Sequence, residues 1–505
     1  MTVNSVTQST MNIERMLSIR AEIDNLGRQL GTGLREDNYA DLGPQRTTSL
    51  AIRADRTTIA GYQAAIQSAS VSVNIMNETV ERLDDLLEDV KGDAIPNTFV
   101  VENGNQTTAQ IAAEHRLQEM VTLLNTDIDG KYLFSGLSSD VEPVVSAEAL
   151  MMGSGGRAGF EQVLAERNLA DLGGTLADPT LDGRLDLATV GAIASITEAG
   201  NDVFGFQLDT AAGASSTSAN ITETGPAGAS NSLSFEVTGT VDLGETLRFT
   251  LAMPDGSSRD IVLEAADARE EGDLSFVVDA DPLVTAANIT AALTDVIDDV
   301  ARRDLIAASA HQAGHDFFDN VPPLRVTPDP VAGIAGATAL AGDPANTIIW
   351  YQGEDGPVDA RDTRLTRVDE NVRVAHGARA NESAFATALR ETAVFAAMDY
   401  DVSDDSAADR YTELANRTRA GLDDPSGQNL PRSVSVELGT AFTMMEATSA
   451  RHRSTDAIYA NLLNDVEGVT EEEVAAKLLD LQTRLQATYS LTATLSELTL
   501  VNFLR

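Results

Sequence analysis

The sequence predicts a mainly α fold at both termini, built from long antiparallel coiled-coil rod helices, with a central β-rich α+β insertion. Apolar residues near both ends recur at the alternating three- and four-residue spacing of a coiled-coil seam. Between residues 137 and 430 this pattern gives way to Gly, Ala, Thr and Asp, with short alternating apolar stretches. Because a narrow apolar stripe on one helix stays exposed until another helix covers it, we expect the N- and C-terminal helices to pair.

The first predicted helix occupies the N-terminal segment, residues 1–35. Its apolar positions are spaced 3-4-3-4 from Met16 onward, which predicts one buried stripe. We expect this core helix to pair with the C-terminal segment, residues 466–505. Each segment has only one partner helix, so the pair is expected to be marginally stable alone and to order on assembly. The predicted packing positions in the first helix are Ile19, Ile23, Leu26 and Leu30.

The second helix carries the longest periodic pattern in the chain. Pro96 and Gly104 end this pattern, and a third helix is expected from residue 108 to 128. Residues 36–150, together with residues 345–465, are therefore predicted to form a coiled-coil rod domain with β-hairpins. The second helix presents ten consecutive apolar positions of one seam about 30 residues long, namely Ile59, Tyr62, Ile66, Ala69, Val73, Met76, Val80, Leu83, Leu87 and Val90.

The pattern changes abruptly at the octapeptide DGKYLFSG, residues 129–136. Three large apolar residues, Tyr132, Leu133 and Phe134, lie between two glycines directly after the third helix. Gly130 is expected to end that helix, and the apolar triplet is expected to begin a strand that packs on the rod helices. After Gly136 the chain is expected to leave the rod and to continue into the insertion.

The insertion, residues 151–344, and the segment that returns from it alternate short strands with helices. An antiparallel meander is predicted from the strands at 233–239, 246–256 and 259–265, with the turn Pro-Asp-Gly inside the second. The insertion is therefore expected to be a mixed α/β domain. The remaining predicted elements are strands at 275–280, 347–353 and 363–374, and helices at 285–318, 382–399 and 406–422.

Two helices are predicted at the C-terminal end. The first runs from about residue 433 to 463, after Pro431. Thr470 is expected to be the N-cap of the second helix, with Glu473 completing a capping box. This second helix is expected to continue almost to Arg505. Its predicted packing positions against the N-terminal helix are Leu478, Leu481, Leu485, Leu495 and Leu498.

Composition excludes several classes of partner. The 505 residues include 78 acidic and 35 basic side chains, for a net charge of −43, which repels nucleic acid and anionic membranes. The chain has no cysteine, so disulfides, thiolate metal sites and cysteine nucleophiles are excluded. It has neither a run of 18 apolar residues nor a recognisable cleavable signal peptide, so we expect no membrane insertion.

Motifs with catalytic or metal-binding potential are weak. The pair His311 and His315 has the spacing of a zinc peptidase helix, but Gln312 stands where a general-base glutamate is needed. Acidic clusters at 264–271, 298–304 and 399–405 lack the spacing of a calcium loop. The sequence GSGG, residues 153–156, is interpreted as a flexible linker because no Lys-Ser or Lys-Thr follows it. We therefore expect no enzymatic activity, no cofactor and no bound metal.

Four stretches carry a resemblance to the bacterial flagellin and hook-associated protein family. With the helices around them they cover about 250 of the 505 residues. DGKYLFSG is similar to the family's G-x-Y-L-F-x-G motif, which is more typical of hook-associated protein 3, the hook–filament junction branch, than of filament flagellins. The motif positions are Gly130, Tyr132, Leu133, Phe134 and Gly136. The other three stretches are QLGTGLR at 29–35, the β-rich return at 348–385, and the C-terminal helix at 478–505.

The resemblance implies a structural role in the bacterial flagellum. In this family the paired terminal helices line a hollow axial structure, the rod surrounds them, and the insertion faces outward. The implied function is a homo-oligomeric adapter at the hook–filament junction, with filament flagellin as the alternative and an acidic adhesin or inserted hydrolase as a distant third. The implied partners are other copies of the chain, hook-associated protein 1, filament flagellin and a flagellar export chaperone. The implied location is the extracellular flagellum, reached by type III export without signal cleavage.

Overall fold

The computed structural model describes residues 2–38, 40–200, 203–226, 231–270, 272–423 and 430–503. The side chains of residues 2–9, 102–103 and 495–503 lie outside the description. Long helices near both ends and a strand-rich centre confirm the coarse fold prediction. The chain divides into two compact units, Met1–Ser70 with Thr366–Val374 and Phe442–Arg505, and Val71–Leu365 with Ala375–Ala441.

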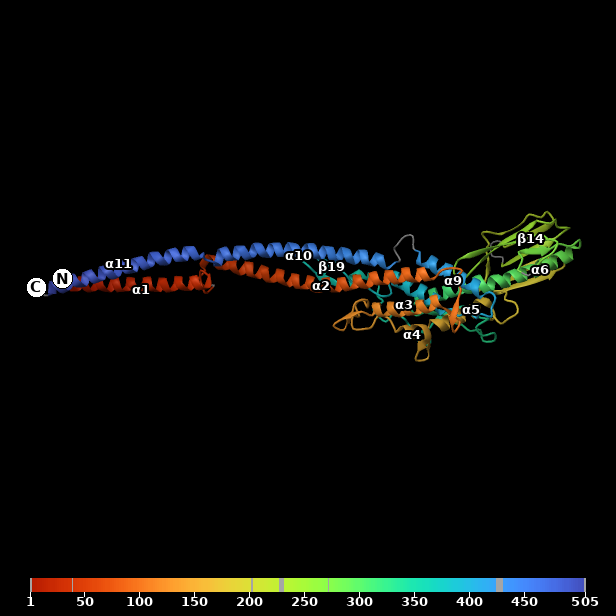
Figure 1. Cartoon of the computed structure of the whole chain (residues 1–505), viewed down its shortest axis with the longest axis horizontal. Helices are drawn as coiled ribbons and strands as arrows, with labels where there is room; N and C mark the ends of the chain where they lie inside the picture. Colours follow the sequence, from red (N-terminus) through yellow and green to blue (C-terminus); the bar gives the residue numbers. More distant parts are fainter. Residues whose placement is uncertain are drawn as a thin grey trace. The chain divides into compact units, whose positions relative to one another are not determined.

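The first unit is built from long helices that run side by side. Helix α1 (Thr2–Thr32) lies antiparallel to α11 (Glu471–Phe503) (Figure 1). Helices α2 (Arg46–Asp93) and α10 (Pro431–Glu467) contribute residues 46–70 and 442–467 to this unit. Ion pairs and ring contacts join these two stretches, as in the Arg56–Asp456 pair at 2.8 Å.

The seam predicted along α2 is buried. Nine of its ten positions are buried, and only Tyr62 is partly exposed. The Tyr62 ring stacks on the His452 ring of α10 with 5.6 Å between centroids. The hairpin of β18 (Leu365–Arg367) and β19 (Arg373–Ala375) reaches the same place, where His452 Nε2 donates to the Val368 carbonyl at 2.7 Å. A 3-4 apolar spacing therefore identified this seam correctly.

The second unit has a helical core centred on α8 (Ser383–Ala397). Every residue from Ala384 to Ala396 is buried, as expected of a helix that is covered on all sides. Its neighbours include α3 (Thr108–Leu124), α5 (Phe160–Leu172), α7 (Ile306–Phe318) and α9 (Ala407–Leu422). A π-helical turn, Ala301–Leu305, joins α7 to α6 (Pro282–Val300), so the single helix predicted at 285–318 is interrupted.

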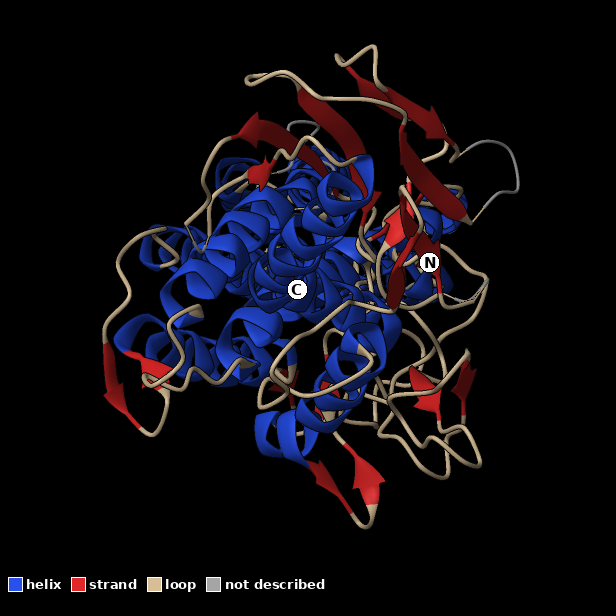
Figure 2. Ribbon diagram, turned by 90° about the vertical axis from the view of Figure 1, so that its right-hand side faces the viewer, coloured by secondary structure: helices blue, strands red, loops and turns tan. Residues whose placement is uncertain are grey.

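The longer strands of the second unit form two sheets, and Figure 2 shows them gathered apart from the small two-stranded hairpins. One sheet has the order β11-β12-β8-β7, and the other has the order β10-β13-β14-β15 with β9 also on β13. Phe235 of the first sheet and Phe249 of the second lie 6.4 Å apart. The bounds are Leu185–Val190 for β7, Ile193–Glu198 for β8, Gln207–Leu208 for β9, Ala214–Ser216 for β10, Ile221–Thr224 for β11, Ser232–Val237 for β12, Thr246–Ala252 for β13, Ser258–Ala266 for β14 and Ser275–Val277 for β15.

The predicted three-strand meander is wrong in its connectivity. β13 and β14 form the expected hairpin, and Gly256 supplies its turn with a φ of +79°. β12, however, pairs with β8 and β11 in the other sheet. The predicted strand at 347–353 makes only single bridges, Thr347 with Ala158 and Tyr351 with Val144. Local alternation predicts a strand but not which strand it pairs with.

Short elements complete the second unit. They include the helix α4 (Ala147–Met152) and several two-stranded hairpins. The hairpin strands are β1 (Val101–Asn103), β2 (Gln106–Thr107), β3 (Asp127–Ile128), β4 (Lys131–Tyr132), β5 (Gly153–Ser154), β6 (Arg157–Ala158), β16 (Leu324–Thr327) and β17 (Ala339–Gly342). The interpretation of residues 153–156 as a flexible linker is therefore wrong, because they lie in the β5–β6 hairpin.

Candidate assembly site

A small apolar cluster holds α1 against α11. Leu26 of α1 packs with Val474 and Leu481 of α11, and the three side chains are 7%, 1% and 8% exposed. The partly buried side chains around them are Ile19, Ile23, Val469 and Leu478. The structure thus brings together five predicted packing positions, Ile19, Ile23, Leu26, Leu478 and Leu481.

The remaining predicted packing positions lie elsewhere. Leu30 is 42% exposed, and Leu485 is half-buried outside the cluster. The prediction for Leu30 therefore differs from the structure: Leu26 packs against Val474, so in the antiparallel pair Leu30 lies one turn further on, where α11 has only just begun at Glu471. Leu495 and Leu498 belong to α11, but their side chains lie outside the described residues.

The junctions α1–α2 and α10–α11 are fastened to each other by backbone hydrogen bonds. The Arg35 amide donates to the Glu467 carbonyl at 2.7 Å, and the Val469 amide donates to the Gly33 carbonyl at 3.1 Å. These bonds lie within and beside the QLGTGLR stretch. Gly33 has a φ of +69°, a conformation that suits glycine at the end of a helix. The C-terminal end of α1 and the start of α11 are therefore fixed in register with each other.

The Glu467 carboxylate anchors this junction to α2. It accepts hydrogen bonds from the Ser49 hydroxyl and from Arg53, whose Nε lies 3.0 Å away. Glu467 is only 7% exposed. The Arg53 hydrogen bond, with that of Ser49, holds the pKa of Glu467 below its ordinary value although burial acts in the opposite direction. Sequence reasoning missed this anchor, because its residues are over 400 positions apart in the chain.

The start of α11 follows the predicted capping pattern in part. The Glu473 amide donates to the Thr470 hydroxyl at 3.3 Å, as an N-cap requires. The Glu473 carboxylate pairs with Lys477 at 2.7 Å, one turn further along the helix. Thr470 thus caps the helix, whereas the side chain of Glu473 supports the first turn through an i, i+4 pair.

Large apolar side chains of the helix pair are left open to solvent. On α11, Leu479, Tyr489 and Leu491 are 65%, 51% and 62% exposed. On α1, the exposed side chains include Met11, Ile13 and Leu17, at 61%, 52% and 63%. Fully burying one such side chain would contribute about 1.5–3 kcal/mol. The α1–α11 pair therefore buries one apolar seam internally and presents further apolar side chains that another protein surface could cover.

The octapeptide DGKYLFSG forms a tight turn that is followed by buried apolar side chains. Asp129 and Gly130 have φ values of +52° and +75° and connect Ile128 to Lys131 as a two-residue hairpin. The third helix already ends at Leu124. The predictions that Gly130 ends this helix, and that the helix reaches Ile128, are therefore wrong. Gly130 instead closes the β3–β4 hairpin.

The apolar triplet of the octapeptide docks on the return segment. Leu133 and Phe134 are 1% and 0% exposed, whereas Tyr132 is half-buried at the end of β4. The Phe134 ring meets Phe385 of α8 edge-on, with 5.6 Å between centroids. Its carbonyl accepts from the Ala380 amide at 2.8 Å. Only Tyr132 of the triplet lies in a strand, and Leu133 and Phe134 act as core side chains.

Gly136 ends the octapeptide at a crowded position. Its φ is +64°, and a Cβ there would lie 3.0 Å from Glu354 Oε2 and 3.1 Å from Arg379 Cγ. The Gly136 amide donates to the Ala378 carbonyl at 3.2 Å. Conformation and space both favour glycine at this position. The octapeptide therefore packs against those residues of the return segment that belong to the second unit, and both stretches carry the resemblance.

The two histidines of HQAGH are each paired with a carboxylate. His311 Nε2 lies 2.8 Å from Glu391 Oε2, and His315 Nδ1 lies 2.7 Å from Asp319 Oδ2. The Gln312 amide donates to Asp316 at 3.0 Å. The two histidine rings are 5.5 Å apart. In the part of the chain that the structure describes, no group of three His, Cys, Asp or Glu side chains could hold a metal ion.

A second buried network lies at the other face of α7. Arg167 pairs with Asp171 and Asp316, each at 2.8 Å, and its side chain is 3% exposed. Asp171 also accepts from the Ser309 hydroxyl at 2.6 Å and from the Gly205 amide at 2.9 Å. Burial raises the pKa of Asp171 despite these donors. The i, i+4 spacing of Arg167 and Asp171 was the only local signal in the sequence for this network.

The predicted acidic clusters are partly brought together. Asp298 and Asp299 face the 401–409 segment across a depression of about 890 Å³, which Arg302 also lines. Arg302 Nε pairs with Asp298 at 2.8 Å. The described residues of the third cluster, 264–270, adjoin this depression, because Arg269 pairs at 2.5 Å with Asp295, which lines it. These contacts describe an acidic surface that is partly neutralised by arginine.

Comparison with known proteins gives no assignment. No protein-family model matches this sequence, and no curated protein matches it significantly. Among the described residues, no helix combines the length and the apolar character needed to cross a membrane.

Proposed function

We propose that this chain is a structural protein of the bacterial flagellum, a hook–filament junction protein that assembles with copies of itself through α1 and α11. The observation that carries the proposal is the α1–α11 pair, which has one internal seam and exposed leucines on both helices. A helix pair that has three buried side chains in the cluster among its described residues gains stability when a neighbour covers its remaining apolar surface. The resemblance of DGKYLFSG and the return segment to the flagellin and hook-associated family supports the same role.

The proposal extends to partners and location. We place the chain outside the cell, exported through the flagellar type III apparatus with the help of an export chaperone. Its axial neighbours would be hook-associated protein 1 on one side and filament flagellin on the other. We also propose that the chain has no enzymatic activity. Both histidines of HQAGH are engaged by carboxylates of the second unit, which supports a structural role for them.

Filament flagellin is the alternative, since the same helix pair would serve indefinite polymerisation. A deletion strain separates the two roles. Loss of a junction protein should leave cells that carry hooks without filaments and secrete flagellin into the medium. Immunogold labelling should mark a band at the filament base. Intact filaments in the deletion strain, or label along the whole filament, would contradict the junction role, and the latter result would favour flagellin.

A further inference from the structure

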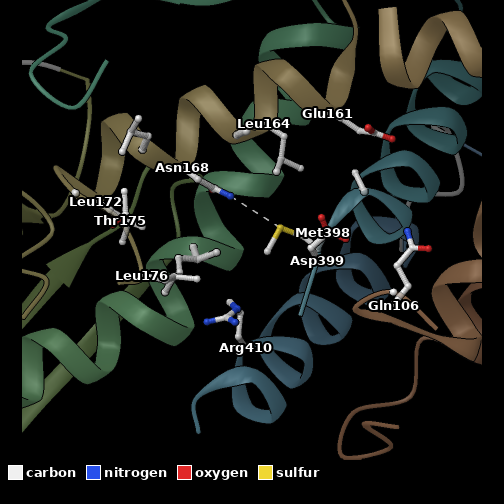
Figure 3. A pocket seen from close by; sticks show the side chains of 16 residues that line it. Gln106, Glu161, Leu164, Asn168, Leu172, Thr175, Leu176, Met398, Asp399 and Arg410 are labelled. Carbon is white, nitrogen blue, oxygen red and sulfur yellow. Dashed lines mark hydrogen bonds between the residues drawn. The ribbon is translucent and has the colours of Figure 1, made fainter. Parts of the chain in front are cut away.

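A cavity of about 640 Å³ opens in the second unit beside α5. Figure 3 shows α5, the end of α8 and the start of α9 around it, with Gln106 at one side. Asn168 of α5 and Met398 point toward one another, and Asn168 Nδ2 lies 3.9 Å from the Met398 sulfur. The volume falls in the range typical of small-ligand sites. The cavity belongs to neither the helix pair α1–α11 nor the octapeptide.

One side of this cavity is apolar. The side chains there come from α5, from the loop after it and from the start of α7. They are Leu164, Leu169, Leu172, Leu176 and Ile306. Figure 3 shows Leu172 and Leu176 on the side opposite Gln106. Branched aliphatic side chains without hydrogen-bonding groups favour a short hydrocarbon chain as the ligand portion that lies against them.

The other side carries two carboxylates, Glu161 and Asp399. Figure 3 places them on the same side of the cavity as Gln106. Within the described part of the chain, neither carboxylate makes an ion pair or accepts a side-chain hydrogen bond. Both residues are exposed, yet desolvation at the cavity wall still raises the pKa of both carboxyl groups, and the charge of Asp399 adds to the rise for Glu161. A cation placed between them would relieve this repulsion.

Arg410, the arginine among the described residues of the cavity wall, is buried beside other groups, although its Nε and Nη2 atoms make no hydrogen bond. Arg410 is 1% exposed and pairs with Asp404 at 2.8 Å, and its Nη1 donates to the Arg302 carbonyl at 3.1 Å. Its guanidinium also lies 5.7 Å from the centroid of the Tyr400 ring. In Figure 3 Arg410 lies well apart from Glu161. The arginine therefore does not neutralise the two carboxylates.

We propose that this cavity binds a primary alkylammonium group, with the ammonium at Glu161 and Asp399 and the hydrocarbon chain against the leucines of α5. An ammonium supplies three donors to carboxylate acceptors, and its alkyl stem matches the apolar side. The group could come from a free alkylamine or from a lysine side chain of another protein. The inference stands independently of the proposed assembly, whose helices belong to the first unit.

Titration of the full chain with pentylammonium, ethylammonium and 1-pentanol, followed by calorimetry at one ionic strength, tests this proposal. Pentylammonium should saturate a single site. Each methylene lost should weaken binding by up to about fourfold, and 1-pentanol should bind at least about tenfold more weakly. Equal affinity for ethylammonium and pentylammonium would overturn the proposal. It would mean that the net charge of −43 attracts both cations and that the length of the alkyl chain has no effect on binding.

Matched variants locate the site. The double variant Glu161→Gln, Asp399→Asn should lose about tenfold or more in affinity for pentylammonium. The control is Asp186→Asn, Glu236→Gln, which removes the same charge from two exposed strand positions and should bind like the parent. Equal losses in both variants would overturn the proposal. Circular dichroism establishes that each variant is folded.

A final pair of probes separates the two sources of the group. Pentylammonium and Nα-acetyl-lysine N-methylamide carry the same ammonium on a similar stem, and each has a single positive charge. Tighter binding of pentylammonium assigns the site to a free alkylamine, and tighter binding of the capped lysine assigns it to a protein side chain. Failure of both to bind would overturn the proposal.

Discussion

His311 and Glu391 show how the local packing sets the charge state of individual residues. Glu391 is fully buried, and its carboxylate lies between His311 and Arg390, whose Nε is 3.2 Å away. Helix α9 approaches so closely at Gly421 that a Cβ there would lie 2.5 Å from the Glu391 carboxylate carbon. Burial alone would lower the pKa of His311 and raise that of Glu391. Their mutual attraction reverses both directions.

These directions predict a pH window for the stability of the second unit. Because the folded pKa of His311 is raised above 6.5, its contribution is complete below that pH and is lost as the pH rises through the folded pKa. Because the folded pKa of Glu391 is lowered below 4.5, its contribution is complete above that pH and is lost as the pH falls through the folded pKa. The pair therefore contributes fully between pH 4.5 and 6.5.

The variant His311→Gln tests this window. Removing one partner of a buried pair should lower the free energy of unfolding by about 3 kcal/mol at pH 6. The difference from the parent should shrink as the pH rises above 6.5, the ordinary pKa of the residue. Trp350 is the only tryptophan and is 2% exposed, so its fluorescence reports unfolding of the second unit. A difference that stays constant from pH 6 to 9 would contradict the ion-pair account.

Phe134 offers a second test at the scale of one residue. Phe134→Ala removes a fully buried ring that packs on Phe385, and it should lower the free energy of unfolding by about 3–5 kcal/mol. Leu137→Ala, three residues further and 61% exposed, is the matched control and should change stability by less than about 0.5 kcal/mol. Denaturant titration with Trp350 fluorescence measures both. Similar losses of unfolding free energy in the two variants would mean that the buried Phe134 ring does not stabilise the packing of the octapeptide.

At the scale of elements, helical seams were predicted well because the signal is local. Along α2, apolar side chains three and four residues apart lie on one face, so the spacing alone identifies the buried positions. The ends of helices were predicted less well. α3 stops at Leu124, where the Asn125 side chain turns to the Val144 backbone, and that contact is not visible in the local sequence.

Strand pairing and the polar anchors could not be predicted either, because the partner residues are not visible in the local sequence. The strands β12 and β13 are adjacent in sequence, yet β12 pairs with β8 and β11. Ser49 and Glu467 are 418 residues apart, and neither residue type indicates its partner. Of the candidate site, periodicity identified five packing positions that the structure brings together, Ile19, Ile23, Leu26, Leu478 and Leu481. The exposed leucines were not, because a single helix pattern does not show which apolar residues its partner leaves uncovered.

The helix pair α1–α11 should be the least protected helical element of the monomer. Among its described side chains the internal cluster has three that are buried, whereas α8 is buried along nearly its whole length. We therefore expect the amides of α1 and α11 to exchange with solvent at least about tenfold faster than those of α8. Hydrogen exchange followed by mass spectrometry measures this difference, with α8 as the internal reference. Equal protection would show that the pair does not need a neighbour for stability.

At the scale of the whole molecule, net charge is the main obstacle to association between copies of the chain. A net charge of −43 makes copies of the chain repel one another, so assembly must overcome this repulsion with apolar contacts. Screening strengthens with salt, since the Debye length falls from about 30 Å at 0.01 M to about 3 Å at 1 M ionic strength.

Salt should therefore accelerate self-association. Seeded assembly followed by light scattering should become faster as sodium chloride rises across this range. Sucrose at matched osmolality is the control, and it should have a smaller effect because it does not screen charge. Assembly that slows with salt would indicate that attraction between opposite charges, and not apolar contact, holds the copies together.

The most direct test of the assembly claim compares two variants of α11. Leu479→Asp places a charge on a leucine that is 65% exposed in the monomer, and Gln482→Asp places the same charge on an exposed polar position one turn away. Incorporation of each purified protein onto flagellar fragments is measured by sedimentation. We predict that Leu479→Asp folds normally but fails to incorporate, whereas Gln482→Asp incorporates like the parent. Normal incorporation of Leu479→Asp would contradict assembly through this face of the helix pair.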